Sequence, residues 1–190
     1  LHEVDDLLKR YQKPSFWKTA EKKFALYENR GVEKRIQRWK LWQKLYRLEV
    51  LRPRWREYLK KQEEYLYQDL SQEIYEKAWQ EFADTSPDRA VEYEQLLMYY
   101  IFCYLCGAVY DEDLFSKVKL AVVHTMLIQE MDFGVWLSRE KGFSFEDQVE
   151  LVHRYARETE HSDPNMEAME CMAAEDEAFC LEKLLRGVLG

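Results

Sequence analysis

Apolar side chains recur about every 3.6 residues along this chain, and this period constrains its fold more than any other feature. Trp42, Leu45 and Tyr46, for example, fall on one face of a predicted helix. Sustained alternation of apolar and polar residues, which would indicate strands, is absent, and only 6 Gly and 4 Pro interrupt the 190 residues. We therefore predict an all-α fold, an irregular multi-helix bundle of about eight or nine helices with no sheet.

Capping residues and helix breakers set the expected boundaries. Helices are expected over residues 3–11, 15–29, 32–51, 53–82 with a second start at Ser71, 86–107, 111–134, 144–161 and 162–185. Asp111 is expected to cap the most apolar helix, which should be central, and Gly134 is expected to kink or end it. Ser144 and Asp147 have the spacing of a capping box. The helix over 15–29 is expected to turn Phe16, Ala20, Phe24 and Tyr27 inward.

Charge is distributed unevenly between the two halves. Residues 1–64 hold 18 Lys+Arg and 10 Asp+Glu, a net charge of +8, and the remaining 10 and 26 give −16. Glu33, Glu49 and Glu57 interrupt the basic residues, which favours solvated helix faces over a nucleic-acid surface. We expect one domain over residues 1–190, with 84–87 as the seam if there are a basic subdomain 1–84 and an acidic subdomain 85–190.

The longest uncharged stretch, residues 95–110, has sixteen residues. A membrane span needs about 20, so we interpret this stretch as a buried core helix. Four cysteines without a secretory segment indicate a reducing, cytoplasmic setting. The chain opens at Leu1 rather than Met, so we expect a processed protein or, more simply, an excised fragment of a longer one.

Two sequence patterns resemble metal sites but are better explained otherwise. Cys103 and Cys106 form a C-x-x-C in mid-helix without a second ligand pair, so we expect two buried, small apolar side chains. Two Glu-x-x-His pairs, residues 150–153 and 158–161, have the spacing of di-iron ligands. Both pairs lie on one helix, so they cannot face each other across a bundle. We expect no metal site, which makes a metal-carboxylate enzyme the weakest interpretation.

The six tryptophans indicate an aromatic-rich core, although partner-binding surfaces use the same residue. No phosphate-binding glycine loop, dinucleotide fingerprint or nucleophile elbow occurs. Composition and spacing alone therefore do not reveal a reaction.

The second half of the chain resembles the flagellin lysine-N-methylase family. The resemblance rests on motifs in order: Tyr99-Tyr100-Ile101-Phe102, residues 107–111, 117–122, 143–148 and 154–162, and Asn165-Met166-Glu167. A weaker match covers residues 48–51 with Arg54-Trp55, so that the similarity extends over roughly residues 46–170.

The resemblance implies that the parent protein methylates lysine side chains of flagellin in the bacterial cytoplasm, with S-adenosylmethionine as the methyl donor. Family members carry an N-terminal cysteine-rich box that binds an iron–sulfur cluster or metal, and this chain lacks such a box. We therefore expect a C-terminal helical domain that contributes scaffold or substrate surface and is inactive alone. The alternative is a non-catalytic helical adaptor that binds a protein partner through its Trp-rich basic half.

The resemblance also selects candidate substrate-surface or structural residues. They are Asp111, Lys117, Arg157, Glu158, Glu160 and His161. Arg157 and His161 lie one turn apart near a helix C-terminus, where cations are favoured, and they could lock the turn at Ser162 against the Asp111 cap. Alternatively, Glu158 or Glu160 could hold a lysine ammonium before methylation. We favour the structural interpretation.

Overall fold

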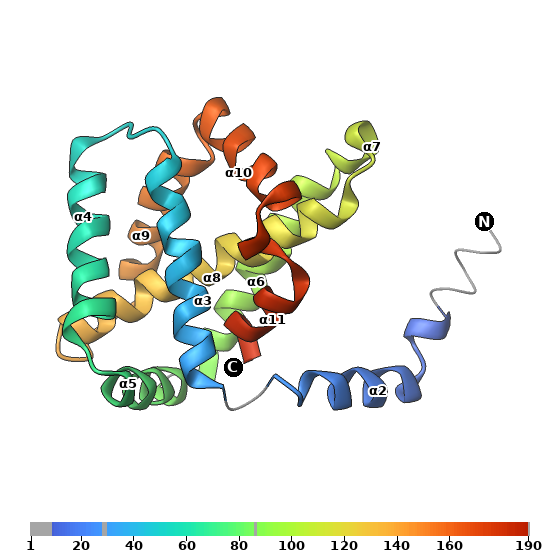
Figure 1. The fold of residues 1–190 in the computed structure, drawn as a ribbon, viewed down its shortest axis with the longest axis horizontal. Coiled ribbons are helices and arrows are strands. Elements are labelled where there is room, and N and C mark those ends of the chain that lie inside the picture. Colours follow the sequence, from blue (N-terminus) through green and yellow to red (C-terminus); the bar gives the residue numbers. More distant parts are fainter. Residues whose placement is uncertain (1–8, 28–29, 86, 190) are drawn as a thin grey trace.

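The computed structural model describes residues 9–27, 30–85 and 87–189, and in these residues it is helical without strands (Figure 1). This confirms the predicted all-α fold. The expected helix over 3–11 and the expected cap at Ser86 lie largely outside the described residues. The α-helices are α2 (Pro14–Phe24), α3 (Gly31–Lys44), α4 (Pro53–Glu63), α5 (Gln72–Thr85), α6 (Pro87–Leu105), α7 (Ala108–Asp111), α8 (Leu114–Ser138), α9 (Phe145–Thr159), α10 (Asp163–Glu175) and α11 (Leu181–Leu189).

Three short segments of other helical types lie between these α-helices. They are two 3₁₀ turns, η1 (Leu45–Arg47) and η3 (Glu177–Phe179), and one π-helical segment, η2 (Glu64–Asp69). The helix expected over 32–51 therefore ends at Lys44 and tightens into η1. None of the helices in the described ranges is both long and apolar enough to cross a membrane.

Helix α8 is the centre of the bundle, as its apolar sequence predicts. Helices α3, α6, α9, α10 and α11 all pack against it. Leu120, Val123 and Ile128 of α8 are fully buried. The expectation that Gly134 ends this helix is wrong, because α8 continues to Ser138. Gly134 instead allows close packing, since a Cβ there would collide with the side chain of Gln62 on α4.

The buried aromatic residues form a second, smaller core between α5 and the end of α8. Its rings belong to Tyr75, Trp79, Phe82, Phe133 and Trp136. Phe133 contacts Trp79 edge-on, with 4.8 Å between ring centroids. Edge-to-face aromatic pairs stabilise a core beyond their buried area, by about 0.5–1.5 kcal/mol each. This cluster fixes α5 against α8.

Four of the six tryptophans lie in the core, as expected for most of them: Trp42, Trp55, Trp79 and Trp136. Trp17 and Trp39 are exposed. Trp17 lies on α2, which extends away from the bundle (Figure 1) and has no buried residue. The expectation that this helix turns its aromatic side chains inward is therefore wrong. It also ends at Phe24, earlier than predicted.

The cap of α8 is Asp113 rather than Asp111. The Asp113 carboxylate accepts a hydrogen bond of 2.9 Å from the backbone N–H of Ser116. Asp111 ends the short helix α7, and Glu112 takes a left-handed conformation with φ 59° that separates the two helices. Two other predicted caps are confirmed: Ser144 and Asp147 form a reciprocal capping box, and the Ser71 hydroxyl accepts from the N–H of Ile74.

The last expected helix, over 162–185, is interrupted at Asp176. Its carboxylate accepts from the backbone N–H of Ala178 and thereby starts η3. The same carboxylate pairs with Lys44 at 2.6 Å and Arg47 at 3.2 Å. These tertiary contacts with the basic half stabilise the interruption at Asp176. Helical spacing in the sequence does not predict this interruption, because the contacts come from distant residues.

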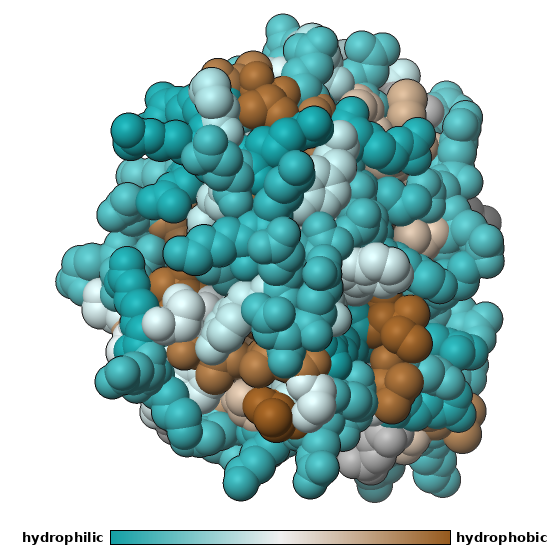
Figure 2. Space-filling model, turned by 60° about the vertical axis from the view of Figure 1, so that its left-hand side comes forward, coloured by the Kyte–Doolittle hydropathy of each residue, from teal (hydrophilic) through white to brown (hydrophobic). Residues whose placement is uncertain are grey.

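The surface is mostly hydrophilic on the side seen in Figure 2, where apolar residues gather only in separate patches. The uncharged stretch 95–110 is only partly buried, contrary to its interpretation as a core helix. Tyr100 is fully buried, whereas Phe102 is 79% and Tyr110 91% exposed. The segment turns only one face towards α8, so the rest of its apolar surface meets solvent.

Candidate functional site

An open apolar groove lies between α6 and α9. It has a volume of about 480 Å³. The residues that line it come from corresponding positions of the two helices: Val91, Glu92, Gln95, Leu96 and Tyr99 from α6, and Phe145, Gln148, Val149, Val152 and His153 from α9. Tyr93 and Gln148 both donate to one oxygen of Asp132, and Tyr100, further along α6, donates to Glu160 just after α9. The two helices therefore run in the same direction along the groove. An apolar cleft with a few polar groups is the usual form of a binding site.

A buried carboxyl group lies directly behind the groove wall. Gln148, which lines the groove, donates a hydrogen bond of 2.8 Å to Asp132 Oδ2, and the Tyr93 hydroxyl donates another of 2.8 Å to the same oxygen. Asp132 Oδ1 has no hydrogen-bond partner within the described part of the chain. Burial raises the pKa of Asp132 to about 7, although both hydrogen bonds and nearby Arg89 oppose the shift. Asp132 can therefore take up or release a proton near neutral pH, a property enriched at functional sites.

Glu160 lies beyond the end of the groove that Tyr99 lines. The hydroxyl of Tyr100 donates to Glu160 Oε1 at 3.0 Å. Burial raises the pKa of Glu160, an effect that the Tyr100 hydrogen bond and His161 partly oppose. Tyr100, which holds this carboxylate, contacts the groove residue Tyr99 edge-on, with 5.4 Å between ring centroids, so Glu160 lies one residue behind this end of the groove.

A buried histidine supports this end of the site. His124 stacks on Tyr100 with 4.9 Å between ring centroids, and its Nδ1 lies 2.7 Å from the Tyr155 hydroxyl. Burial lowers the pKa of His124 to about 3, so the ring is neutral at physiological pH. Tyr104 stacks on the same Tyr100 ring. The aromatic stack fixes Tyr100, and Tyr100 in turn fixes the Glu160 carboxylate.

Of the six candidates selected from the sequence, Glu160 is the one that the structure places near the groove. Arg157 and Glu158 line a different pocket, between the start of α4 and α9. Lys117 is 7% exposed and pairs with Glu170 at 2.7 Å, which joins α8 to α10. The six residues therefore do not form a single site.

The other two candidates are His161, which lies at the surface, and Asp111, whose side chain is not among those that the structure describes. His161 is exposed, and its side chain makes no hydrogen bond to the rest of the described chain. The side chain of Asp111 lies outside the described residues. The turn at Ser162 is held by other groups, because Asn165 donates to the Glu158 carbonyl at 2.7 Å and to the Glu49 carbonyl at 2.9 Å.

Sequence analysis missed Asp132 and Gln148. A usable signal was present, because Glu130 and Asp132 are charged residues within the most apolar helix. A charged side chain on a helix that is otherwise apolar all round must find buried partners, and such groups are more informative than surface charges.

The cysteines are less buried than expected. Cys103, Cys106 and Cys171 are exposed and Cys180 is half-buried. Nowhere in the described ranges do three or more His, Cys, Asp or Glu side chains gather in a way that could hold a metal ion. The donor set that an iron–sulfur cluster requires is therefore not assembled by these residues.

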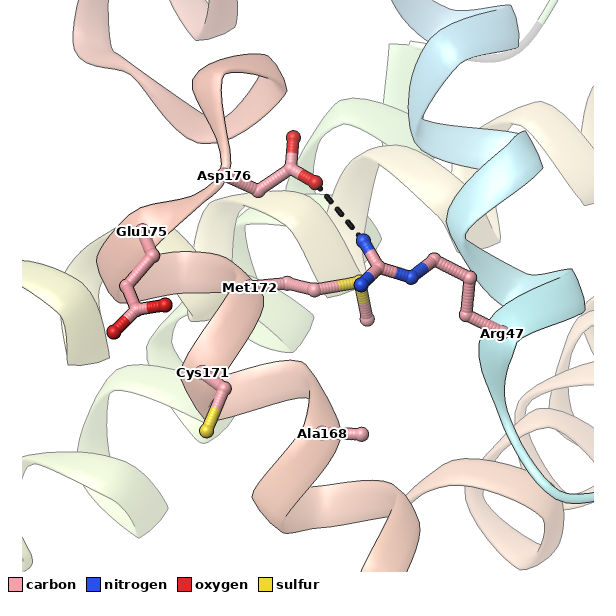
Figure 3. Close-up of a pocket in the computed structure, with 6 residues that line it drawn as sticks. All are labelled: Arg47, Ala168, Cys171, Met172, Glu175 and Asp176. Carbon is pink, nitrogen blue, oxygen red and sulfur yellow. Dashed lines mark hydrogen bonds and ion pairs between the residues drawn. The ribbon is translucent and has the colours of Figure 1, made fainter.

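A further pocket of about 370 Å³ lies between η1 and α10. Figure 3 shows Arg47 and Asp176 joined across it, at 3.2 Å, with Met172 beneath them and Glu175 turned away. Its two facing charged groups already neutralise each other. This pocket thus links the two halves of the chain and offers a ligand little free charge.

The fold and the groove define an all-helical domain with a peptide-sized apolar cleft that has carboxyl groups around it. Over residues 1–187 the chain matches the family model described as the FliB lysine N-methylase C-terminal domain, and it belongs to that family. This confirms the resemblance and extends it beyond residues 46–170. No curated protein and no solved structure shows a significant match to the chain.

Proposed function

We propose that this domain is the substrate-holding part of a lysine N-methylase that acts on flagellin in the bacterial cytoplasm, and that a flagellin segment binds in the α6–α9 groove. The observation that carries the proposal is an open apolar cleft that ends at Tyr99, next to the Tyr100 side chain that holds Glu160. Family membership supplies the reaction class, and the resemblance supplies flagellin as the substrate.

The groove has the chemistry that a lysine-containing segment requires. Val149 and Tyr99 present apolar surface to neighbouring side chains and to the methylene stem of the lysine. Glu92 at one end and Glu160 near the other favour a positively charged amine. The bound lysine would thus lie along the cleft with its ammonium at a carboxylate.

Methylation needs a neutral amine, because only the unprotonated nitrogen can attack a methyl donor. Burial raises the pKa of Glu160, so this carboxylate is better suited than an exposed one to accept the ammonium proton, and the Tyr100 hydrogen bond positions it. We propose that S-adenosylmethionine, and an iron–sulfur cluster if one is used, are requirements of the full-length methylase. The isolated chain is then expected to bind flagellin without methylating it.

Binding of purified flagellin to the chain tests the proposal. Val149→Arg places a charged side chain in the groove and is expected to weaken binding at least tenfold. Val188→Arg is the matched control, since Val188 on α11 is similarly exposed, 42% against 38%, and lies outside the groove. Equal binding by both variants would contradict the proposal.

Two further measurements test whether Glu160 recognises the lysine charge and whether the domain serves methylation or acts as an adaptor. Glu160→Gln is expected to weaken binding of flagellin but not of flagellin whose lysines have been acetylated, since acetylation removes the charge that Glu160 would recognise. In the full-length methylase, Val149→Arg should lower flagellin methylation. If it abolishes binding but leaves methylation intact, the domain is an adaptor instead.

A further inference from the structure

The pocket between α4 and α9 contains charged groups that have no partner among the residues that the structure describes. It has a volume of about 430 Å³, and its lining includes Arg52, Arg54, Arg157 and Glu158. Within the described residues, none of these three arginines forms an ion pair or a side-chain hydrogen bond. Arg154 in the same pocket, by contrast, pairs with Glu150 at 2.9 Å.

Glu158 supplies the opposite charge in the pocket wall. It is 1% exposed, and its Oε2 accepts a hydrogen bond of 3.0 Å from the backbone N–H of Leu51. Its Oε1 is buried without a partner among the described residues. A buried carboxylate oxygen without a donor destabilises the folded chain, so a ligand that brings a donor to it gains binding energy.

The pocket thus combines free cations at its rim with a carboxylate oxygen that lacks a donor. An inorganic anion such as sulfate would satisfy only the arginines, and a simple amine would satisfy only Glu158. A ligand that carries both a carboxylate and an ammonium on adjacent atoms would satisfy both. The planar arginine group matches a carboxylate with two parallel hydrogen bonds.

We infer that this pocket binds an α-amino-acid headgroup, with its carboxylate on the Arg54 and Arg157 side chains and its ammonium donating to Glu158 Oε1. Trp55, which is 4% exposed and also lines the pocket, gives the ligand's side chain an apolar wall. The headgroup can belong to a free amino acid or to a larger molecule that contains one. The inference is independent of the peptide groove.

Calorimetric titration of the chain, without flagellin, tests this inference. The probes are L-methionine, 4-(methylthio)butanoate, which lacks only the amino group, S-adenosyl-L-homocysteine and sodium sulfate. We expect L-methionine to bind at least tenfold more tightly than its deaminated analogue and than sulfate. Tighter binding of S-adenosyl-L-homocysteine supports a nucleoside-linked amino acid as the ligand, and equal binding supports a free one.

Variants assign the binding to this pocket. Arg54→Ala and Arg157→Ala change exposed side chains and should each weaken methionine binding at least tenfold, whereas Arg10→Ala, an exposed arginine far along the N-terminal segment, should not. Glu158→Gln keeps the acceptor for Leu51 and should abolish the preference for methionine over the analogue. The inference is overturned if no probe containing an amino-acid group binds, if sulfate and the analogue bind as tightly as methionine, or if the pocket variants bind like the native chain.

Discussion

Arg38 and Glu130 form an ion pair of 3.1 Å in the interior of the bundle, with side chains only 3% and 1% exposed, and so join α3 to α8. The carboxylate also accepts hydrogen bonds of 2.7 Å from the hydroxyls of Tyr67 and Tyr75. Arg38 Nε donates to the carbonyl of Gly187 at 2.9 Å, which adds α11 to the network. Five elements, α3, η2, α5, α8 and α11, therefore meet at one pair of charges.

Removing one partner of this pair should be severely destabilising. Arg38→Ala leaves the Glu130 charge buried without its cation, and we expect a loss of about 3–5 kcal/mol in the free energy of unfolding. Urea titration followed by circular dichroism measures this loss. Arg30→Ala is the control, because the Arg30–Glu33 pair of 3.4 Å is exposed and should contribute less than about 1 kcal/mol. Similar losses in both variants would contradict the prediction.

Asn165 is expected to be a second site of high sensitivity. It is 1% exposed, donates to two backbone carbonyls and accepts a hydrogen bond of 2.7 Å from the N–H of Glu49. Asn165→Ala would leave these buried groups unsatisfied, and we expect a loss of about 2–4 kcal/mol in thermal or urea unfolding. Gln80→Ala, which removes an exposed amide on α5, should cost less than about 1 kcal/mol.

Local sequence signals predicted the parts of the fold that depend on local interactions. The capping box at Ser144 needs only Asp147 three residues away, and the central position of α8 follows from its own composition. The end of α8 could not be predicted in this way. Gly134 has the sequence appearance of a breaker, and its true role is decided by Gln62, which lies 72 residues earlier.

The candidate site was predictable only in part for the same reason. Glu160 was selected through the family resemblance and lies near the groove. Asp132 and Gln148 belong to different helices, and their hydrogen bond exists only after α8 and α9 have packed together. The absence of a partner at Arg157 and at Glu158 Oε1 is likewise a property of the folded chain, because sequence spacing gives no information on which charges remain unpaired.

Asp132 should make the protein less stable as the pH rises. Burial raises the pKa of Asp132 from 3.8 to about 7, so between these values the folded state binds a proton that the unfolded state has lost. The stability contribution of the group is therefore lost as the pH rises from about 4 to 7. The side chain of the Asp132→Asn variant cannot titrate. Between pH 4 and pH 8 the free energy of unfolding of the native chain should therefore fall, relative to that of the variant, by up to about 4 kcal/mol. Urea midpoints at four pH values measure this, and a constant difference would contradict it.

His124 should have the opposite effect on stability. Burial lowers the pKa of His124 from 6.5 to about 3, so between these values the unfolded state binds a proton that the folded state does not. Stability from this group is complete above pH 6.5 and is lost as the pH falls, at about 1.4 kcal/mol per pH unit. The variant His124→Phe retains a flat ring beside Tyr100 but loses the hydrogen bond to Tyr155. This loss changes the free energy of unfolding by the same amount at every pH.

The predicted result is that the free energy of unfolding depends differently on pH in the native chain and in His124→Phe, whatever the difference in its absolute value. From pH 7 down to pH 5, the native chain should lose about 2 kcal/mol relative to His124→Phe, whereas from pH 7 to pH 8 the difference between the two should stay constant. The constant range serves as the internal control. A native chain whose stability falls in parallel with that of the variant below pH 6.5 would show that His124 is protonated in the folded protein, and that the neutral stack beneath Tyr100 and Glu160 does not exist in solution.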